Sequence, residues 1–275
     1  MNPDVRVNSD VPVNPDVPIV TPDWLALREP ADAAARSVEL AELLRPCPPA
    51  TVHDLGCGTG SMGRWLAPRL PGPQHWVLYD RDPVLLARAA ADGGPASVRT
   101  RLRDITRLTA ADLAGAGLIT ASALLDMLTA AEVERIVAAC VAAACPALLA
   151  LSVTGRVELT PADPLDGRIA AAFNAHQRRT TGGRSLLGPD AVEVTVAAFR
   201  RRGVGVLLRS TPWRLGAGDA ALISEWLAGR LAAACAQEPD LAGAAAAYAR
   251  RRAAQLAEGA LTVVVGHQDL LAGTH

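Results

Sequence analysis

Between residues 50 and 153, short apolar runs alternate with longer segments whose apolar residues recur at helical spacing. The apolar runs look like buried strands, and the segments between them look like amphipathic helices. This alternation predicts an α/β fold, a doubly wound and mostly parallel sheet with right-handed crossovers. The predicted strands are ATVHDLG, HWVLYD, SVRTRLRDI, AGLITASAL and ALLALSV, and the predicted helices are Ser61–Leu70, Pro83–Ala91 and Ala130–Ala144.

After Val153 the alternation loosens. GRVELTPADP predicts a loop, and TTGGRSLLGP predicts a glycine-rich loop. Two more strands, GVGVLLRST and ALTVVVGHQDLL, complete the predicted sheet, the second of them close to the end of the chain. The helices predicted in this part are Leu165–Arg179, Asp190–Arg202 and a long stretch from about Asp219 to Glu258.

The segment before the core divides into two parts. The first residues form a degenerate Asn/Asp-Val-Pro repeat, whose frequent proline predicts a disordered or extended tail over 1–20. A helical pattern then runs from Asp23 to Leu44, where Pro30 allows a break. We expect one domain over 21–275. Its parts are lid helices over 21–45, a core over 50–153, a cover insertion over 154–188 and a helical insertion over 212–258.

Composition narrows the class of protein. The chain has 275 residues, half of them hydrophobic and only 3% aromatic. This composition suits helices packed on an apolar sheet better than an aromatic-rich β-sandwich or a base-stacking RNA-binding sheet. The formal charge of −1 argues against a nucleic-acid partner, and the absence of lysine excludes lysine-dependent chemistry.

The spacing of the cysteines and the length of the apolar runs indicate the cellular compartment. The five cysteines contain no CxxC pair, so their spacing predicts neither a zinc site nor a disulfide framework, and we expect no metal. No basic leader precedes an apolar run at the start, and no apolar run reaches membrane-spanning length. We therefore expect a cytoplasmic protein without a membrane partner.

The strongest motif is Val52-His53-Asp54-Leu55-Gly56-Cys57-Gly58-Thr59-Gly60, which ends a predicted strand and precedes a predicted helix. Glycines at such a turn let backbone N–H groups approach a polar ligand closely. The same glycines also satisfy a dinucleotide pattern, but Asp54 would repel a pyrophosphate at the helix N-terminus. A carboxylate there suits the cationic amino-acid group of S-adenosylmethionine (SAM). Asp80 ends the second strand, where an acid can accept hydrogen bonds from ribose hydroxyls.

DLGCGTG, followed downstream by LYDRDP, resembles the class I SAM-dependent methyltransferases over residues 50 to 155. The resemblance implies a seven-stranded sheet with a reversed last strand, SAM as cofactor and S-adenosylhomocysteine (SAH) as product. It further implies that Asp54 lies near the methionine amino group and that Asp80 binds the ribose. Asp104 would meet the adenine amino group, with Ile105 beside the ring. The other cofactor-binding residues expected from the motifs are Gly56, Cys57, Gly58, Gly60, Arg81 and Ser122.

The rest of the chain resembles bacterial class I methyltransferases in a more generic way. The segments that carry this likeness are TPDWLALREPADAAARS, FNAHQRRTTGGRSLLGPDA, STPWRL and VVVGHQDLLA. They imply a small-molecule acceptor without naming one.

Three segments can cover the carboxyl ends of the strands, where this fold places the acceptor. They are the N-terminal helix, the insertion after the fifth strand and the helical insertion before the last strand. On the first, Arg28, Asp32 and Arg36 share a helix face. They form either a solvated salt-bridge ladder or a lid whose Arg28 or Arg36 reaches the SAM carboxylate or an acidic substrate.

Two residues are candidates for catalysis. His176 shares a face of its helix with Phe173 and Gln177. It is either a general base or acceptor-orienting group, or a histidine favoured by the helix dipole alone. Asp126 is the second candidate, with an N-cap for the following helix as its alternative role.

The scarce aromatic residues indicate where the acceptor binds. Trp24, Phe173 and Trp213 fall in the three covering segments, so we expect them to roof the SAM site, with Arg28 and Gln177 also contacting substrate. Trp213 would need no such role as an ordinary core residue.

The sequence therefore predicts a SAM-dependent methyltransferase that acts on an oxygen, nitrogen or carbon atom of a small molecule, with specialised metabolism as its expected setting. A homodimer is left open. One alternative is a SAM-binding enzyme with other chemistry, such as a cyclase or an aminocarboxypropyl transferase. Another is a non-catalytic SAM-binding partner subunit.

Overall fold

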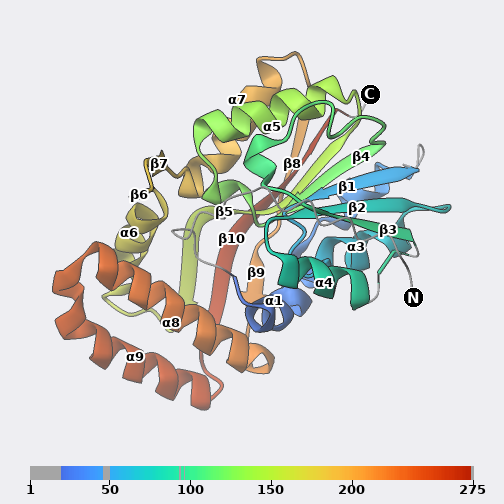
Figure 1. The fold of residues 1–275 in the computed structure, drawn as a ribbon. Helices are drawn as coiled ribbons and strands as arrows, with labels where there is room; N and C mark the ends of the chain where they lie inside the picture. Colours follow the sequence, from blue (N-terminus) through green and yellow to red (C-terminus); the bar gives the residue numbers. More distant parts are fainter. Residues whose placement is uncertain (1–19, 46–49, 93, 96, 274–275) are drawn as a thin grey trace.

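The computed structural model describes residues 20–45, 50–92, 94–95 and 97–273, so the predicted tail lies outside the described residues except for Val20. One sheet has the strand order β3-β2-β1-β4-β5-β10-β8, with β9 also paired to β10. Neighbours from β3 to β5 are parallel, whereas β10 is antiparallel to β5 and β8. The predicted doubly wound, mostly parallel sheet with a reversed last strand is confirmed (Figure 1). The strands are β1 Thr51–Leu55, β2 His75–Asp80, β3 Ser97–Leu102, β4 Leu118–Ser122, β5 Ala147–Thr160, β8 Val206–Ser210, β9 Trp213–Leu215 and β10 Thr262–Ala272.

The sixth predicted strand is β8, and a short strand that the sequence did not predict, β9, follows it. β8 pairs with the Gln268–Ala272 part of β10, and β9 pairs with Val263–Val265. Pro212 lies between them, and a proline cannot donate to a strand ladder. The sheet therefore has the seven strand positions expected, one of them filled by two consecutive segments.

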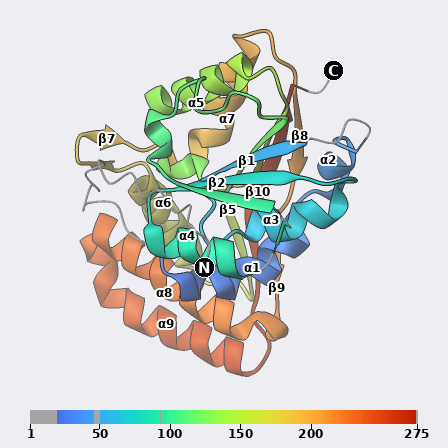
Figure 2. The same cartoon turned by 45° about the vertical axis from the view of Figure 1, so that its right-hand side comes forward.

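Helices cover both faces of the sheet (Figures 1 and 2). On one face, Ile136 and Phe199 from two helices pack against Leu149 of β5. On the opposite face, Met62 and Leu86 pack against strand residues that include Leu118 of β4. The helices of the first face are α5 Ala130–Ala142 and α7 Ala191–Arg200, and those of the second are α2 Val38–Glu42, α3 Ser61–Leu66 and α4 Pro83–Ala91.

Local capping chemistry explains where these helices begin. The Asp82 carboxylate accepts the backbone N–H of Val84 at 2.8 Å, and Pro83 occupies the first helical position of α4. Thr129 and Glu132 form a capping box that starts α5. Both helices therefore start where the residue pattern predicts.

A helical cover lies beyond the regular part of the sheet. β5 and β10 continue past the other strands as a long antiparallel pair, and the helices of the cover gather around this extension (Figures 1 and 2). Here, the cover means α1 Pro22–Ala35, α6 Asp166–Gln177, α8 Ala220–Gln237 and α9 Ala242–Ala257, with the outer ends of β5 and β10.

Several elements of the cover differ from the sequence prediction. The predicted loop GRVELTPADP is strand up to Thr160, because Thr262–Val265 of β10 pair with it. The single helical stretch is the hairpin α8–α9, broken at the 3₁₀ turn Pro239–Leu241.

The other differences are local. The glycine-rich loop is a hairpin of β6 Thr180–Thr181 and β7 Arg184–Ser185, with Gly182 and Gly183 at positive φ in its turn. Pro30 lies inside α1 without ending it, and the N-terminal helix breaks at Arg36 instead. Within the described ranges, no helix is long and apolar enough to cross a membrane.

Candidate active site

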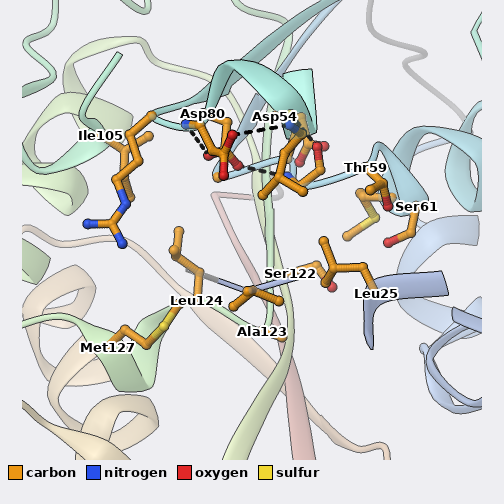
Figure 3. Close-up of a pocket in the computed structure, with 18 of the residues that line it drawn as sticks. Leu25, Asp54, Thr59, Ser61, Asp80, Ile105, Ser122, Ala123, Leu124 and Met127 are labelled. Atoms are coloured by element: carbon orange, nitrogen blue, oxygen red, sulfur yellow. Dashed lines mark hydrogen bonds between the residues drawn. The ribbon is translucent and has the colours of Figure 1, made fainter. Parts of the chain in front are cut away.

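A cavity of about 330 Å³ opens at the carboxyl ends of β1, β2 and β4 (Figure 3). Its size falls in the usual range of small-molecule sites, about 300–1,000 Å³. The cavity lies on the edge of the sheet where this class of fold binds ligands. It is lined by residues 56–59, 80–83, 103–106, 122–124 and 127–128, together with Val20, Leu25, Arg28, Asp32, Asp54, Ser61, Met62, Leu85 and Arg184.

The glycine loop between β1 and α3 forms one wall of this cavity. Gly56 and Gly58 have φ of +64° and +55°, the left-handed region that other residues rarely adopt. A Cβ at Gly56 would lie 3.1 Å from Leu124 Cδ1, and one at Gly58 would lie 3.0 Å from Leu25 Cδ1. The backbone conformation therefore favours glycine at both positions, and a side chain there would also press against a neighbouring leucine.

The remaining loop residues have different surroundings. Gly60 begins α3 at φ +84° and lies outside the cavity lining. Cys57 lines the cavity, and burial raises the pKa of its thiol well above the usual value. This thiol is therefore protonated and is not an activated nucleophile.

Asp54 is the most unusual polar residue of the cavity wall. It is 1% exposed, and Thr120 Oγ1 donates to its Oδ1 at 2.7 Å. Its Oδ2 is buried and has no hydrogen-bond partner among the described residues. Burial raises the pKa of Asp54 to about 7, against the opposing effects of Thr120 and Arg36. A buried carboxylate oxygen without a donor matches a cationic or N–H-bearing ligand group.

Asp80 ties the second strand to the glycine loop. Its Oδ2 accepts the Gly58 N–H at 2.9 Å, and its Oδ1 accepts the Asp82 N–H at 3.0 Å (Figure 3). Each carboxylate oxygen has lone pairs beyond those that these bonds use, so both can still accept from ligand hydroxyls. Arg81, the next residue, also lines the cavity.

Asp104 and Ile105 follow β3 on the other side of Asp80. The Asp104 carboxylate accepts from the Thr106 N–H at 3.0 Å and from its hydroxyl at 2.7 Å. This caps the 3₁₀ turn Ile105–Arg107. Both residues line the cavity, and the predicted adenine contacts of Asp104 and Ile105 stay predictions.

The end of β4 closes the floor of the cavity. Ser122, Ala123 and Leu124 lie next to one another there (Figure 3). Ala123 has φ of +50°, a strained conformation for a residue with a side chain. Such strain is concentrated at functional sites and turns the chain sharply out of the sheet at this point.

The three polar residues predicted to share a face of the N-terminal helix have separate partners. Arg28 donates to both oxygens of Asp32, at 2.9 and 3.1 Å, and both residues line the cavity. Trp213 Nε1 donates to Asp32 Oδ1 at 3.0 Å, and the Arg28 guanidinium lies 5.0 Å from the centroid of the Trp213 ring. Arg36 follows the end of α1 and donates instead to Ser61 and Ser122.

The aromatic residues predicted to roof the site lie elsewhere. Trp213 is 3% exposed and packs in a cluster with Ile223 of α8 and Val263 of β10. Trp24 packs against the same cluster, and Phe173 packs against a second one between α6, α8 and α9. None of the three lines the cavity, where Leu25 and Leu124 contact the glycine loop instead. Their contact with an acceptor stays a prediction.

The two candidate catalytic residues are also outside the cavity lining. His176 and Gln177 are half-buried on α6, and burial and Arg179 lower the pKa of His176. Asp126 lies next to the lining residue Met127, and burial raises its pKa to about 6. It does not cap the following helix, because Thr129 does so. In the described part of the chain, no other side chain donates to the Asp126 carboxylate.

The structure also reveals site residues without a sequence signal. Leu25 and Leu124 touch the glycine loop, and Arg184 reaches the cavity while paired with Glu132 at 2.7 Å. Leucine and arginine are common throughout this chain, so neither residue type marks a site by itself. Only the folding of α1, of the turn after β4 and of the β6–β7 hairpin onto one strand edge brings them together.

Sequence comparison identifies related proteins. Residues 52–147 match the family model described as a methyltransferase domain. A segment of 72 residues is 43% identical to a trans-aconitate 2-methyltransferase of Streptomyces avermitilis, and it covers 26% of this chain. The match spans only 24% of that relative's length.

Comparison of the fold gives a broader match. The structure of the cyclopropane synthase MmaA2 from Mycobacterium tuberculosis superposes with a TM-score of 0.50 and 15% identity, over 92% of this chain and 94% of that one. An O-methyltransferase family protein from Burkholderia thailandensis superposes with a TM-score of 0.46 and 18% identity, over 89% and 57% of the two chains. At such low identity, the likeness to MmaA2 shows a shared fold alone.

Proposed function

We propose that this chain, which carries a class I, Rossmann-like methyltransferase domain, is a SAM-dependent enzyme that methylates an oxygen, nitrogen or carbon atom of a small molecule. The methyltransferase family match over residues 52–147 supports the cofactor. The observation that carries the proposal is the convergence of Asp54, the glycine loop and Asp80 on one cavity. The specialised-metabolic setting and the cytoplasmic location are part of the proposal.

The residues of the cavity fit SAM by their chemistry. The unpartnered Oδ2 of Asp54 suits the ammonium of the methionine group, and Asp80 suits the ribose hydroxyls. The glycine loop leaves room that a Cβ at Gly56 or Gly58 would fill. Ile105 offers an apolar surface beside the position expected for the adenine. When bound, SAM supplies a methyl carbon already activated by its sulfonium.

The protein then has to align an acceptor, exclude water and remove a proton where the acceptor requires it. Leu25, Leu124 and Met127 supply apolar walls that exclude water from the cavity. For proton removal we favour Asp126 over His176, because Asp126 directly precedes a lining residue and has no side-chain partner. With a pKa of about 6, its carboxyl is ionised at neutral pH and is able to accept a proton.

The charge of the cavity wall indicates which class of acceptor the site can bind. Five aspartates share the cavity wall with four arginines, and Arg28, Arg103 and Arg184 are paired with carboxylates, so the wall is not the basic surface that a nucleic acid requires. We therefore propose a small-molecule acceptor and no nucleic-acid or membrane partner. The name of the Streptomyces relative makes carboxylic acids a first group of acceptors to test.

Product analysis tests the proposal. The purified chain is incubated with SAM and a small-molecule library, and nucleoside products are separated by liquid chromatography with mass detection. SAH formation that depends on an acceptor supports methyl transfer, whereas methylthioadenosine supports aminocarboxypropyl chemistry. A calorimetric titration in which neither SAM nor SAH binds would contradict the proposed cofactor.

A further inference from the structure

Arg36 is a buried cation that lies behind the cavity wall, in contact with the lining residues Ser61 and Ser122. It is the residue after α1, and its φ of −53° and ψ of +140° turn the chain out of the helix. Its side chain is 3% exposed and extends to the ends of α3 and β4, which lie far from it in the sequence. The tertiary structure therefore places a positive charge behind the cavity.

Only neutral groups contact this charge. Arg36 Nη2 donates to Ser61 Oγ at 2.9 Å and to Ser122 Oγ at 3.0 Å, and Nη1 donates to the Ser61 carbonyl at 3.3 Å. Among the residues that the structure describes, no carboxylate lies within ion-pair distance of its guanidinium. Ser61 and Ser122 both line the cavity, so the guanidinium is one hydrogen bond away from a ligand.

The acids near Arg36 are engaged by other groups. Asp32 is held by Arg28 and Trp213. Asp269 accepts from the Leu151 N–H at 2.7 Å and from the Ser37 N–H at 2.8 Å. Their charges stabilise the guanidinium only from a distance, while burial lowers the pKa of Arg36.

Arg252 shows what a buried arginine with a paired charge looks like in this chain. It is 1% exposed, and its Nη2 donates to both oxygens of Asp166 at 2.5 and 2.6 Å. A buried charge without such a counter-ion is costly, and native proteins rarely retain one without use. Arg36 therefore lacks the anionic partner that Arg252 has.

Asp54 carries the opposite charge at the same end of the cavity. Thr120, its hydrogen-bond donor, and Ser122, a partner of Arg36, both lie on β4, two residues apart. Asp54 and Arg36 influence each other electrostatically, but no hydrogen bond or ion pair joins them in the described structure. A buried cation and a buried anion that remain separate are complementary to a ligand with one charge of each sign.

We propose that Arg36, with Ser61 and Ser122, binds the α-carboxylate of the methionyl group of SAM, while Asp54 faces its ammonium. This inference rests on the proposed function. It assigns the carboxylate to Arg36 and not to Arg28, whose charge is already neutralised by Asp32. Arg36 directly follows α1, the helix from which Leu25 and Arg28 line the cavity. Cofactor binding to Arg36 would therefore also stabilise the position of this helix.

A ligand that lacks only the carboxylate isolates this contact. Calorimetry compares SAH with its decarboxylated form, S-(5′-adenosyl)-3-thiopropylamine. We expect the wild-type protein to bind SAH at least about 30-fold more tightly, because a buried charge left without its partner weakens a complex by that order. In Arg36→Met, this preference should fall to within about threefold, through weaker binding of SAH and not tighter binding of the amine.

Two further variants separate recognition from folding. Arg36→Lys keeps the charge and should restore part of the preference. Arg28→Met tests the alternative arginine, which lines the cavity from α1, and it should keep the wild-type ratio between the two ligands. Thermal melts check that each variant is folded.

The outcomes distinguish the two proposals. Equal binding of both ligands by the wild-type protein would show that Arg36 does not recognise the carboxylate, and the proposed function would stand. This comparison needs only the wild-type protein, so it holds even when Arg36→Met fails to fold. An unchanged preference in folded Arg36→Met would also overturn the assignment. If the wild-type protein binds neither SAH nor SAM, the proposed function itself fails.

Discussion

The acids near the glycine loop and the acids in the cover have different surroundings. At the strand ends, Asp54 has one oxygen without a donor among the described residues, and Asp80 accepts from backbone N–H groups. In the cover, Asp166 is held by Arg252 and by Tyr248 Oη at 2.8 Å, and the Asp32 carboxylate by Arg28 and Trp213.

This difference separates recognition from structure. A satisfied buried network rigidifies the fold and has no capacity left for a ligand. An acid with free lone pairs beside a cavity is costly to the folded state unless something binds it. The acid with an unpartnered oxygen therefore marks the proposed cofactor site, and the paired acids mark the scaffold that positions it.

Replacing Trp213 by alanine should have the largest effect and should act on stability. Removal of this buried ring and its bond to Asp32 should lower the free energy of unfolding by roughly 3–5 kcal/mol, measured by denaturant titration. SAH affinity of the folded protein should change less than about threefold, since Trp213 is outside the cavity lining. Leu207→Ala, at a 38% exposed position of β8, is the control, and it should lower the free energy of unfolding far less. A large loss of affinity without a loss of stability would instead place Trp213 in the binding site.

Replacing Asp80 by alanine should act on affinity and not mainly on stability. The loss of the carboxylate that we propose binds the ribose should weaken SAH binding by roughly 1–3 kcal/mol in a calorimetric titration. Asp190→Ala in the exposed Arg178–Asp190 pair is the matched acid replacement away from the cavity, and it should leave the affinity unchanged. Equal affinity of Asp80→Ala and the wild-type protein would remove Asp80 from the site.

The pH dependence of SAH binding should reveal Asp54. Its pKa of about 7 means that its carboxyl is mostly protonated at pH 6 and mostly ionised at pH 8. The ligand ammonium needs the ionised form, so SAH affinity should fall by about tenfold as the pH drops from 8 to 6. Asp54→Asn should flatten this profile, whereas Asp126→Asn, whose carboxyl has a pKa of about 6, should retain it. A pH-independent wild-type affinity would contradict the role of Asp54.

Arg230 should give the smallest effect and is the exception within the cover. It is 5% exposed between the rings of Phe173 and Trp226, and burial lowers its pKa to about 10. In the described ranges, it has no hydrogen bond or ion pair. Arg230→Met should therefore keep or raise the free energy of unfolding, by up to about 1 kcal/mol, in thermal and denaturant melts. A clear loss of stability would show that the two aromatic rings compensate the buried charge.

The residues of the proposed cofactor site could be predicted from the sequence because each is placed by nearby residues. The glycines of DLGCGTG, the acid two residues before them and the acid ending HWVLYD are each placed by their own strand. Parallel strands bring their carboxyl ends to one edge of the sheet, so residues that end successive strands become neighbours. Asp54, Gly58 and Asp80 meet for this reason.

The side-chain pairings of the cover could not be predicted in the same way, because its residues do not end neighbouring strands at one edge of the sheet. The pattern placed Arg28, Asp32 and Arg36 on one helix face, but α1 ends before Arg36, which turns to Ser61 and Ser122. Trp213 bonds to Asp32, from which it is separated by most of the chain. Such pairings depend on how the helices pack against the β5–β10 extension. The spacing of residues along one helix does not predict this packing.

The sequence by itself determined the alternation of strands and helices, the glycine turn and the acids at the strand ends, since backbone conformation and strand alternation follow from nearby residues. Only the tertiary structure decided which polar groups remain unsatisfied. Among the described residues, Asp54 has an oxygen without a partner and Arg36 has no ion pair, whereas Arg28 and Arg252 are paired with acids, although all four side chains are charged groups in the sequence. The physical reason is that desolvation and pairing are set by contacts between distant segments, and these contacts exist only once the chain has folded.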